Sequence, residues 1–203
     1  MNVRAGTVEE AIGAARAAFE ARTRDPQAAV SVARIFGALR EPLEGEGAAP
    51  ARLPVCDLLA EAADPSRFTD PALRRLAAAL LRLDPVLAWR RRGGEATNAS
   101  AGFQDGHANA MIAGPAGLEP RRDVWLGVSL LAPGVRYPDH DHAPEETYLV
   151  LSEGEFSQND GPWFEPGVGG SFHNPPGIRH AMRAGPAPLL AVWALWADRP
   201  QQP

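Results

Sequence analysis

Side chains that can bind a transition metal are concentrated in the second half of the chain. One residue separates His140 from His142, Glu146 follows after a short gap, and His180 lies in a later segment. Alternate residues of a strand point to one face, so His140 and His142 would face the same side, and Glu146 and Tyr148 continue that alternation. Burying three histidines and a carboxylate together is costly unless a metal or mutual pairing compensates. The sequence therefore predicts a mononuclear metal site built from His140, His142, Glu146 and His180.

The predicted ligands restrict the metal without selecting one. Imidazole and carboxylate groups suit Zn(II), Fe(II), Mn(II), Ni(II) or Cu(II), and we expect one divalent transition metal ion, with Zn, Fe(II) and Mn as the candidates. A site with three or four protein ligands and an open position is typical of catalysis. The two remaining histidines, His107 and His173, are expected to be ordinary strand or loop residues.

The composition narrows the classes of function. The chain has 203 residues, a formal net charge of -5 and 45% hydrophobic residues, which fits a globular protein and disfavours a nucleic-acid partner. All twenty basic residues are arginine, so Schiff-base chemistry and lysine general bases are excluded. The single cysteine, Cys56, cannot form an internal disulfide and is expected to be buried on a helix.

Membrane insertion and export are not expected from the sequence. The chain contains no apolar run of about 18 residues, the length that a membrane-spanning helix needs. The first residues do not resemble a signal peptide, because the acidic pair Glu9-Glu10 precedes the first apolar stretch. We therefore expect a cytoplasmic protein with no membrane partner.

Helices are predicted for about the first ninety residues. Thr7 and Glu10 form a capping-box pattern before apolar residues at helical spacing, and Pro26 fits the first turn of a second helix. The predicted helices cover about 8–22, 26–40, 53–63 and 71–83, with a short one around 86–91. The run Arg90-Arg91-Arg92 is interpreted as the solvated end of that short helix.

The pattern changes after Gly93-Gly94. Residues 95–106 are polar and Gly-rich, and from His107 onward short apolar segments alternate with Gly and Pro turns. This spacing favours many short antiparallel strands in a sandwich or barrel. We expect 1–94 to form a helical N-terminal region, 95–106 a loop or linker, and 107–199 a β-barrel with the metal site. The helices should pack on the barrel, since alone they have too little core.

Two segments carry a specific motif. The segment from Gly134 to Gly154 contains His-x-His, three residues and Glu, and the segment from Gly169 to His180 ends in Pro-x-Gly-x-x-His. The pair resembles the two motifs of the cupin superfamily, with seven rather than six residues before Gly154 and with Ala184 where the family has Asn. The resemblance implies a mainly β fold, a cupin double-stranded β-helix (jelly-roll barrel), with the α-helical N-terminal region packed on it.

Three stretches are similar to one group of cupins, the dimethylsulfoniopropionate lyases, and most similar to the DddQ type. They are YPDHDHAPEETYLVLS from Tyr137, PPGIRH ending at His180, and AVWALWAD near the C-terminus. The resemblance implies cleavage of dimethylsulfoniopropionate into dimethyl sulfide and acrylate. It also implies metal ligation by His142, Glu146 and His180, with His140 as a further ligand or close neighbour, and it places Tyr137 and Tyr148 at the active site.

The implied β-elimination needs a base near the carbon next to the substrate carboxylate. A divalent cation that binds the carboxylate would stabilise the charge developing there. The pKa of free tyrosine is about 10, and a nearby metal lowers it by favouring phenolate. We expect a tyrosinate base and favour Tyr148 slightly, with Tyr137 as a substrate-positioning residue or the alternative base.

The leaving group of this reaction is a sulfonium cation, which aromatic faces attract. Trp193 and Trp196 differ by an odd number of residues, so a regular strand would point them to opposite sides. Of these two, Trp193 is expected to line the cavity, together with Trp125.

Two other functions are compatible with the same ligands. A different metal-dependent cupin enzyme, such as a dioxygenase or an isomerase, would not need the tyrosine pair. A non-catalytic cupin sensor would often lack part of the ligand set. The expected partner is a small-molecule sulfonium carboxylate, and a homodimer is a family expectation only. Whether the loop over 95–106 closes over the site is left open, although its composition would permit this.

Overall fold

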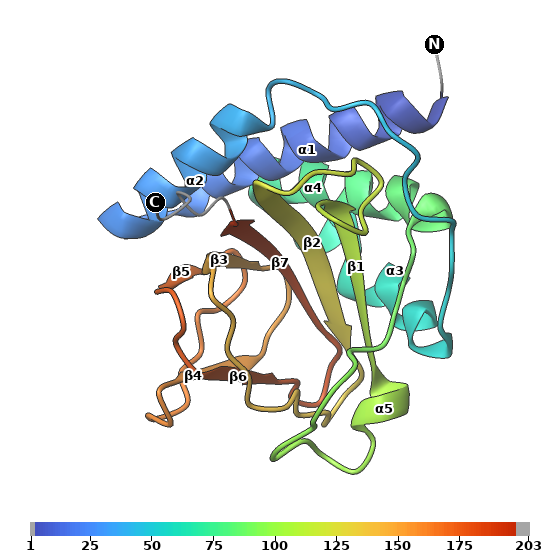
Figure 1. The fold of residues 1–203 in the computed structure, drawn as a ribbon. Coiled ribbons are helices and arrows are strands. Elements are labelled where there is room, and N and C mark those ends of the chain that lie inside the picture. The colour runs from blue at the N-terminus through green and yellow to red at the C-terminus, as the bar shows by residue number, and fades with distance from the viewer. Residues whose placement is uncertain (1–2, 198–203) are drawn as a thin grey trace.

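Helices occupy the N-terminal part of the chain and strands the C-terminal part (Figure 1). The computed structural model describes residues 3–197, with side chains described from residue 6 onward. The helices are α1 (Val3–Arg22), α2 (Pro26–Ala38), η1 (Pro54–Leu58), α3 (Leu59–Ala62), η2 (Pro65–Arg67), α4 (Pro71–Leu83), η3 (Asp84–Val86) and α5 (Phe103–Gly106), where η marks a 3-10 helix.

Two of the long helices begin at an aspartate followed by a proline. The Asp25 carboxylate accepts a hydrogen bond from the Ala28 backbone N–H at 2.8 Å, and Asp70 accepts one from Ala72 at 2.8 Å. Each aspartate satisfies a free N–H of the first helical turn, and the proline ring fixes the backbone there. The first helix begins at Val3, earlier than the start near residue 8 that the capping-box pattern predicts.

All the strands pair antiparallel and form two sheets. The strands are β1 (His107–Ala113), β2 (Val124–Leu131), β3 (Glu145–Val150), β4 (Glu155–Gln158), β5 (Ser171–Asn174), β6 (His180–Arg183) and β7 (Leu189–Trp196). Five of them form a sheet in the order β1-β2-β7-β3-β5, and β4 pairs with β6 in a second sheet. The predicted division at residue 106 coincides with the start of β1, but the segment 95–106 contains the short helix α5.

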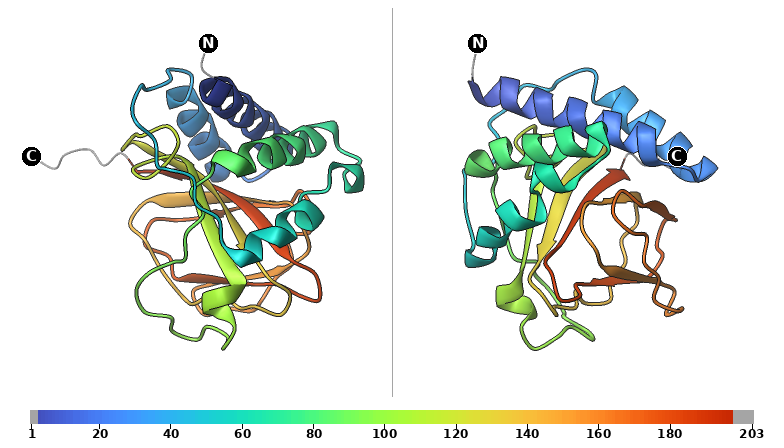
Figure 2. Two further views of the ribbon diagram at one scale, coloured as in Figure 1. Left: turned by 90° about the vertical axis from the view of Figure 1, so that its right-hand side faces the viewer. Right: turned by 180° about the vertical axis from the view of Figure 1, so that it is seen from behind.

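The large sheet is covered on both faces. Helices α1, α2 and α4 lie against its outer face (Figures 1 and 2), where Leu126, Val128 and Leu130 of β2 join the helical core. The alternate β2 residue Leu131 points inward, into a second core that includes Val150 and Met182. Burial on both faces explains why β2 and β7 read as nearly continuous apolar runs. The predicted packing of helices on a barrel is therefore confirmed.

Two predictions about the helical region have mixed outcomes. Cys56 is completely buried in η1, as predicted. The predicted helix over 86–91 is wrong, because the chain after Val86 becomes extended and Arg90 pairs with Asn109 of β1.

Within residues 3–197, no helix is long and apolar enough to cross a membrane.

Candidate metal centre and its cavity

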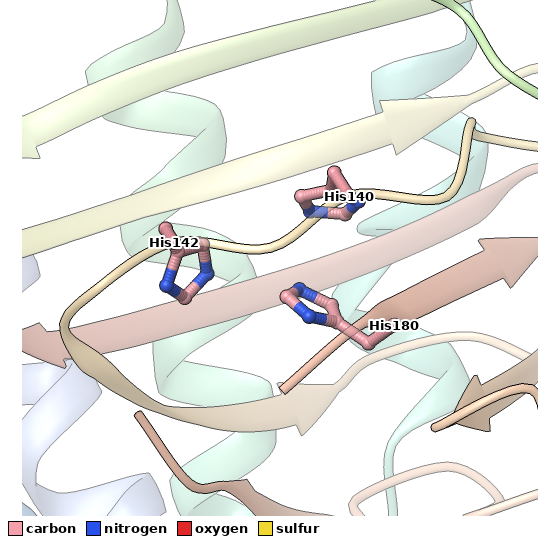
Figure 3. Close-up of side chains that lie close together, drawn as sticks. All are labelled: His140, His142 and His180. Carbon is pink, nitrogen blue, oxygen red and sulfur yellow. The ribbon is translucent and has the colours of Figure 1, made fainter. Parts of the chain in front are cut away.

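Three histidines from separate positions in the chain meet at one point. The side chains of His140, His142 and His180 each offer a ring nitrogen, and these nitrogens lie within 4.8 Å of one another (Figure 3). His180 begins β6, and its backbone forms two hydrogen bonds with that of His140, at 3.0 and 2.8 Å. His140 and His142 lie outside regular strands, so the strand alternation expected for them does not apply. Backbone pairing of His140 with His180 brings them together instead.

Backbone carbonyls orient all three imidazoles. In each ring Nδ1 faces a carbonyl two residues away: Pro138 for His140 at 3.0 Å, Pro144 for His142 at 2.9 Å and Ile178 for His180 at 2.9 Å. A carbonyl only accepts hydrogen bonds, so these contacts assign the proton to Nδ1 and leave the lone pair on Nε2. This arrangement is typical of histidines that ligate metals.

Glu146 supplies a carboxylate beside two of these rings. Its Oε2 lies 3.3 Å from Nε2 of His142 and 3.2 Å from Nε2 of His180. Nε2 of His180 is buried and has no hydrogen bond of acceptable geometry, so lone pairs face one another across these gaps. In a tetrahedral site with zinc–nitrogen and zinc–oxygen bonds of about 2.0 Å, two ligand atoms lie about 3.3 Å apart. The two gaps to Glu146 match this separation. The predicted ligands thus come together, and their donor atoms fit a divalent cation.

An amide holds the Glu146 carboxylate in place. Asn174 of β5 is completely buried and donates from Nδ2 to Glu146 Oε2 at 3.1 Å. Its own Oδ1 accepts a hydrogen bond from Gln158 Nε2 at 2.6 Å, which fixes the orientation of the amide. Asn174 was not predicted from the sequence, because only the pairing of Glu146 with Asn174 between β3 and β5 brings it to the site.

Replacing Asn174 with alanine is expected to weaken metal binding without abolishing it. Loss of an outer partner of a metal ligand costs about 10–100-fold in affinity, because the carboxylate becomes less well oriented. Competition with a chromophoric chelator would measure the change. An Asn174→Ala protein that is folded and binds Zn(II) as tightly as the unaltered protein would contradict this role.

The ionisation of the site groups follows from burial and mutual contact. Burial alone raises the pKa of Glu146, but the adjacent imidazoles of His142 and His180 outweigh burial and hold the pKa below its usual value. Burial lowers the pKa of His140 to about 3, and the neighbouring His180 adds to this effect. Burial also lowers the pKa of His142, but Glu146 outweighs it and raises the net value. The centre therefore holds an ionised carboxylate beside an imidazole, His140, that stays neutral at physiological pH.

A cavity of about 290 Å³ opens beside the centre. His140, His142 and Glu146 form part of its wall, and Tyr137, Trp125 and Trp193 line it too. Among the described residues, none of those that line this cavity comes from the segment 95–106.

The two predicted tyrosines occupy different positions. Tyr137 lines the cavity, its ring centroid lies 5.0 Å from that of His140, and its hydroxyl oxygen accepts a hydrogen bond from Asn109 Nδ2 at 2.8 Å. Tyr148 does not line the cavity and instead stacks on Phe172 at 5.2 Å. Burial raises the pKa of Tyr137 to about 12, partly offset by Asn109. Burial and the Glu146 charge raise the pKa of Tyr148 well above its usual value.

Trp193 and Trp196 lie in different surroundings on β7. Trp193 points into the cavity, and its indole N–H donates to Ser129 Oγ at 3.0 Å. Trp196 lies elsewhere, with the Arg34 guanidinium over its ring at 4.6 Å. Gly127 makes room for Trp193, because a Cβ there would lie 2.3 Å from the indole and 2.5 Å from the Ala110 carbonyl oxygen. A side chain at position 127 would therefore force Trp193 and the neighbouring strand to shift.

The other histidines lie outside the centre. His173 of β5 has Nδ1 at 3.3 Å from Thr147 Oγ1. His107 is fully buried, and its ring nitrogens contact the Phe103 carbonyl and the Arg92 backbone N–H. Both are thus held by local contacts, and neither belongs to the three-histidine group.

The segment 95–106 is tied to the chain that leads into the metal motif. The Asp139 carboxylate accepts hydrogen bonds from Asn98 at 2.6 Å, Arg136 at 2.6 Å and Arg179 at 2.9 Å. The Asp139 backbone N–H also donates to the Thr97 carbonyl at 3.0 Å. These contacts anchor the segment next to His140.

Two further cavity residues, Asn109 and Arg90, were missed at the level of sequence. Asn109 follows His107 on a short apolar strand and carries no motif. Arg90 belongs to an arginine run that was interpreted as a solvated helix end. A strand pattern across 86–90 could have drawn attention to it, because apolar residues there also fit an extended chain.

Comparisons with known proteins relate the chain to one enzyme family. A family profile described as dimethylsulfoniopropionate lyase matches residues 27–191. The chain is 29% identical over 162 residues to dimethylsulfoniopropionate lyase DddQ of Ruegeria pomeroyi, covering 79% of this chain and 78% of that protein. It is 34% identical over 101 residues to a putative dimethylsulfoniopropionate lyase, DddL, of Cereibacter sphaeroides, covering 48% and 42%.

Solved structures share the whole architecture. The crystal structure of DddQ from Ruegeria pomeroyi has a TM-score of 0.67 and 25% identity, covering 96% of this chain and 94% of that one. A chain from the crystal structures of the lyases RdDddP and RnDddQII has a TM-score of 0.72 and 23% identity, covering 98% and 99%. The predicted fold class, a cupin barrel with helices packed on it, is confirmed.

Proposed function

Because the chain belongs to the dimethylsulfoniopropionate lyase family, we propose that it is a metal-dependent carbon–sulfur lyase that cleaves dimethylsulfoniopropionate into dimethyl sulfide and acrylate. One observation carries the proposal beyond family membership. A single cavity of about 290 Å³ is lined by two histidines of the candidate metal centre, a tyrosine and two tryptophans. A zwitterion with a carboxylate, an acidic C–H bond and a sulfonium group needs these three kinds of partner.

The residues that would hold the metal are His140, His142, Glu146 and His180. A bound divalent ion supplies positive charge that attracts the substrate carboxylate, stabilises the negative charge that develops next to it, and favours ionisation of a nearby tyrosine. In the proposed elimination, a base removes one proton from the carbon next to the carboxylate. The electron pair of that C–H bond forms the C=C bond of acrylate, and the C–S pair leaves with dimethyl sulfide.

Tyr137 is the base that the geometry favours. Tyr137 lines the cavity, whereas Tyr148 does not line it and stacks on Phe172. Asn109 donates a hydrogen bond to the Tyr137 oxygen, and a donor at this atom stabilises phenolate relative to phenol. The slight preference for Tyr148 drawn from the sequence is therefore replaced by a proposal for Tyr137, with Tyr148 as a residue that supports Glu146.

The two indoles that line the cavity would receive the sulfonium end of the substrate. Trp125 and Trp193 are the tryptophans of the wall, and a cation over an indole face gains about 0.5–2 kcal/mol. The hydrogen bond from Trp193 to Ser129 fixes that ring, so it needs little reorganisation when substrate binds. A ring fixed in this way would hold the leaving group in one position.

The direct test is incubation of the metal-loaded protein with dimethylsulfoniopropionate. We expect dimethyl sulfide in the headspace and an equal amount of acrylate in solution. The assay would be repeated with Zn, Fe(II), Mn, Co and Ni, and metal content would be measured in each sample. Absence of both products with every metal, while the metal remains bound, would refute the proposed function.

A further inference from the structure

Arg90 lies on an extended segment that adds to the edge of the large sheet. Its backbone N–H donates to the Asn109 carbonyl at 2.8 Å, and the Asn109 N–H donates to the Arg90 carbonyl at 2.9 Å. Antiparallel residues paired in this way have their side chains on the same face. Asn109 faces the cavity, and Arg90 lines the same cavity together with Ala88, two residues earlier. The register of the sheet edge therefore places Arg90 at the site.

Neighbouring residues hold the Arg90 backbone firmly. Trp89 points the opposite way, is 1% exposed in the helical core, and donates from its indole N–H to Asp84 at 2.7 Å. The Arg92 backbone N–H donates to Nε2 of the buried His107 at 2.7 Å. Anchors on both sides fix the Arg90 backbone beside the cavity, and its exposed side chain extends from this fixed position.

The charge of Arg90 has no internal partner. Its guanidinium forms no ion pair or hydrogen bond within residues 3–197, whereas the adjacent Arg91 binds Asp105 at 2.8 Å. The carboxylate in the cavity wall, Glu146, is engaged by His142 and His180. The Arg90 side chain is exposed to solvent, and a positive charge beside the cavity that no protein carboxylate neutralises attracts an anionic ligand.

We propose that Arg90 binds the carboxylate of the substrate and of the acrylate product, and so selects ligands that carry a carboxylate. The assignment rests on the proposed function, which supplies that carboxylate. A guanidinium presents a planar fork of N–H donors that matches a carboxylate. The carboxylate has about four lone-pair sites, so a bond to Arg90 leaves others free for the metal centre. Repulsion between the guanidinium and the sulfonium directs the cationic end toward the indoles.

The test compares two unreactive ligands that differ in charge, propionate and propionamide. Calorimetric titration of each into metal-loaded protein separates binding from turnover. We expect the unaltered protein to prefer propionate. Arg90→Gln should bind propionate about tenfold or more weakly and propionamide equally well. Arg90→Lys should recover part of the loss, because it restores the charge without the fork.

Matched variants control for packing and for metal loss. Arg91→Gln alters the adjacent arginine, which is tied to Asp105, and should leave both affinities unchanged. Arg90→Met keeps much of the side-chain bulk, so recovery of propionate binding in this variant would show a packing role and overturn the proposal. All titrations are made at equal measured metal content. Unchanged propionate affinity in Arg90→Gln, or no preference in the unaltered protein, would also overturn it. Failure of the proposed function is seen separately, as absence of dimethyl sulfide from the unaltered protein.

Discussion

Replacing Tyr137 with phenylalanine is expected to lower kcat for dimethyl sulfide release by about 10²–10⁴-fold, the range that a general base contributes. Tyr137 lines the cavity, and the substitution removes only its hydroxyl oxygen, which accepts a hydrogen bond from Asn109. The ring can keep its edge-on contact with Phe103 at 5.2 Å. Metal content and fold should therefore be retained, and headspace measurement of dimethyl sulfide at saturating substrate would give the change in kcat.

Tyr148→Phe is the matched control, because it removes the same atom from a buried ring outside the cavity. Its stacking on Phe172 should persist, and we expect a much smaller loss of kcat than for Tyr137→Phe. The opposite order, with Tyr148→Phe almost inactive and Tyr137→Phe close to the unaltered rate, would assign the base to Tyr148. Equal and small losses in both would exclude a tyrosinate base.

The motif residues could be predicted because their spacing carries local information. His-x-His-x3-Glu and Pro-x-Gly-x-x-His specify side chains within short segments, and a turn that includes Gly177, with φ of +72°, leads directly to His180. Family resemblance then joined the two segments at one centre. The strand alternation was a sound argument for Glu146 and Tyr148 on β3, but not for the two histidines that precede it.

The residues that surround the ligands could not be predicted, because long-range pairing places them. Asn174 reaches Glu146 through the register between β3 and β5, and Asn109 reaches Tyr137 from the opposite edge of the sheet. Arg90 was assigned to the solvated end of a short helix predicted around 86–91. Its pairing with β1 and the burial of Trp89 in the core hold this segment in an extended conformation instead.

The sequence also could not distinguish the roles of the two tyrosines, because their surroundings depend on long-range packing. Both flank the metal motif in sequence, and Tyr148 continues the inward alternation of Glu146 on β3. However, side chains fill part of the barrel interior, so an inward-pointing residue does not always line the cavity. Phe156 and Phe172 fill the space around Tyr148, while Tyr137 is adjacent to the open volume. Only the packing of β4 and β5 distinguishes the two positions.

A large expected effect on metal affinity concerns one of the histidines of the candidate metal centre. We expect His180→Ala to lower metal affinity by more than about 100-fold, since loss of an outer partner alone costs about 10–100-fold. Nε2 of His180 lies 3.2 Å from Glu146 and near the ring nitrogens of His140 and His142, so alanine removes one ligand and leaves the carboxylate without its neighbour. Metal content after dialysis and competition with a chelator would measure the loss.

A second histidine provides the control for this experiment. His173 is partly buried on β5, but it contacts Thr147 rather than the centre, so His173→Ala should retain metal even if it costs some stability. Circular dichroism would confirm that both variants are folded before metal is measured. Full metal occupancy in folded His180→Ala would remove His180 from the ligands. Equal loss in both variants would point to general destabilisation instead. Selective loss in His180→Ala would tie the bound ion to the three-histidine cluster and therefore to the cavity that Tyr137 and Arg90 line.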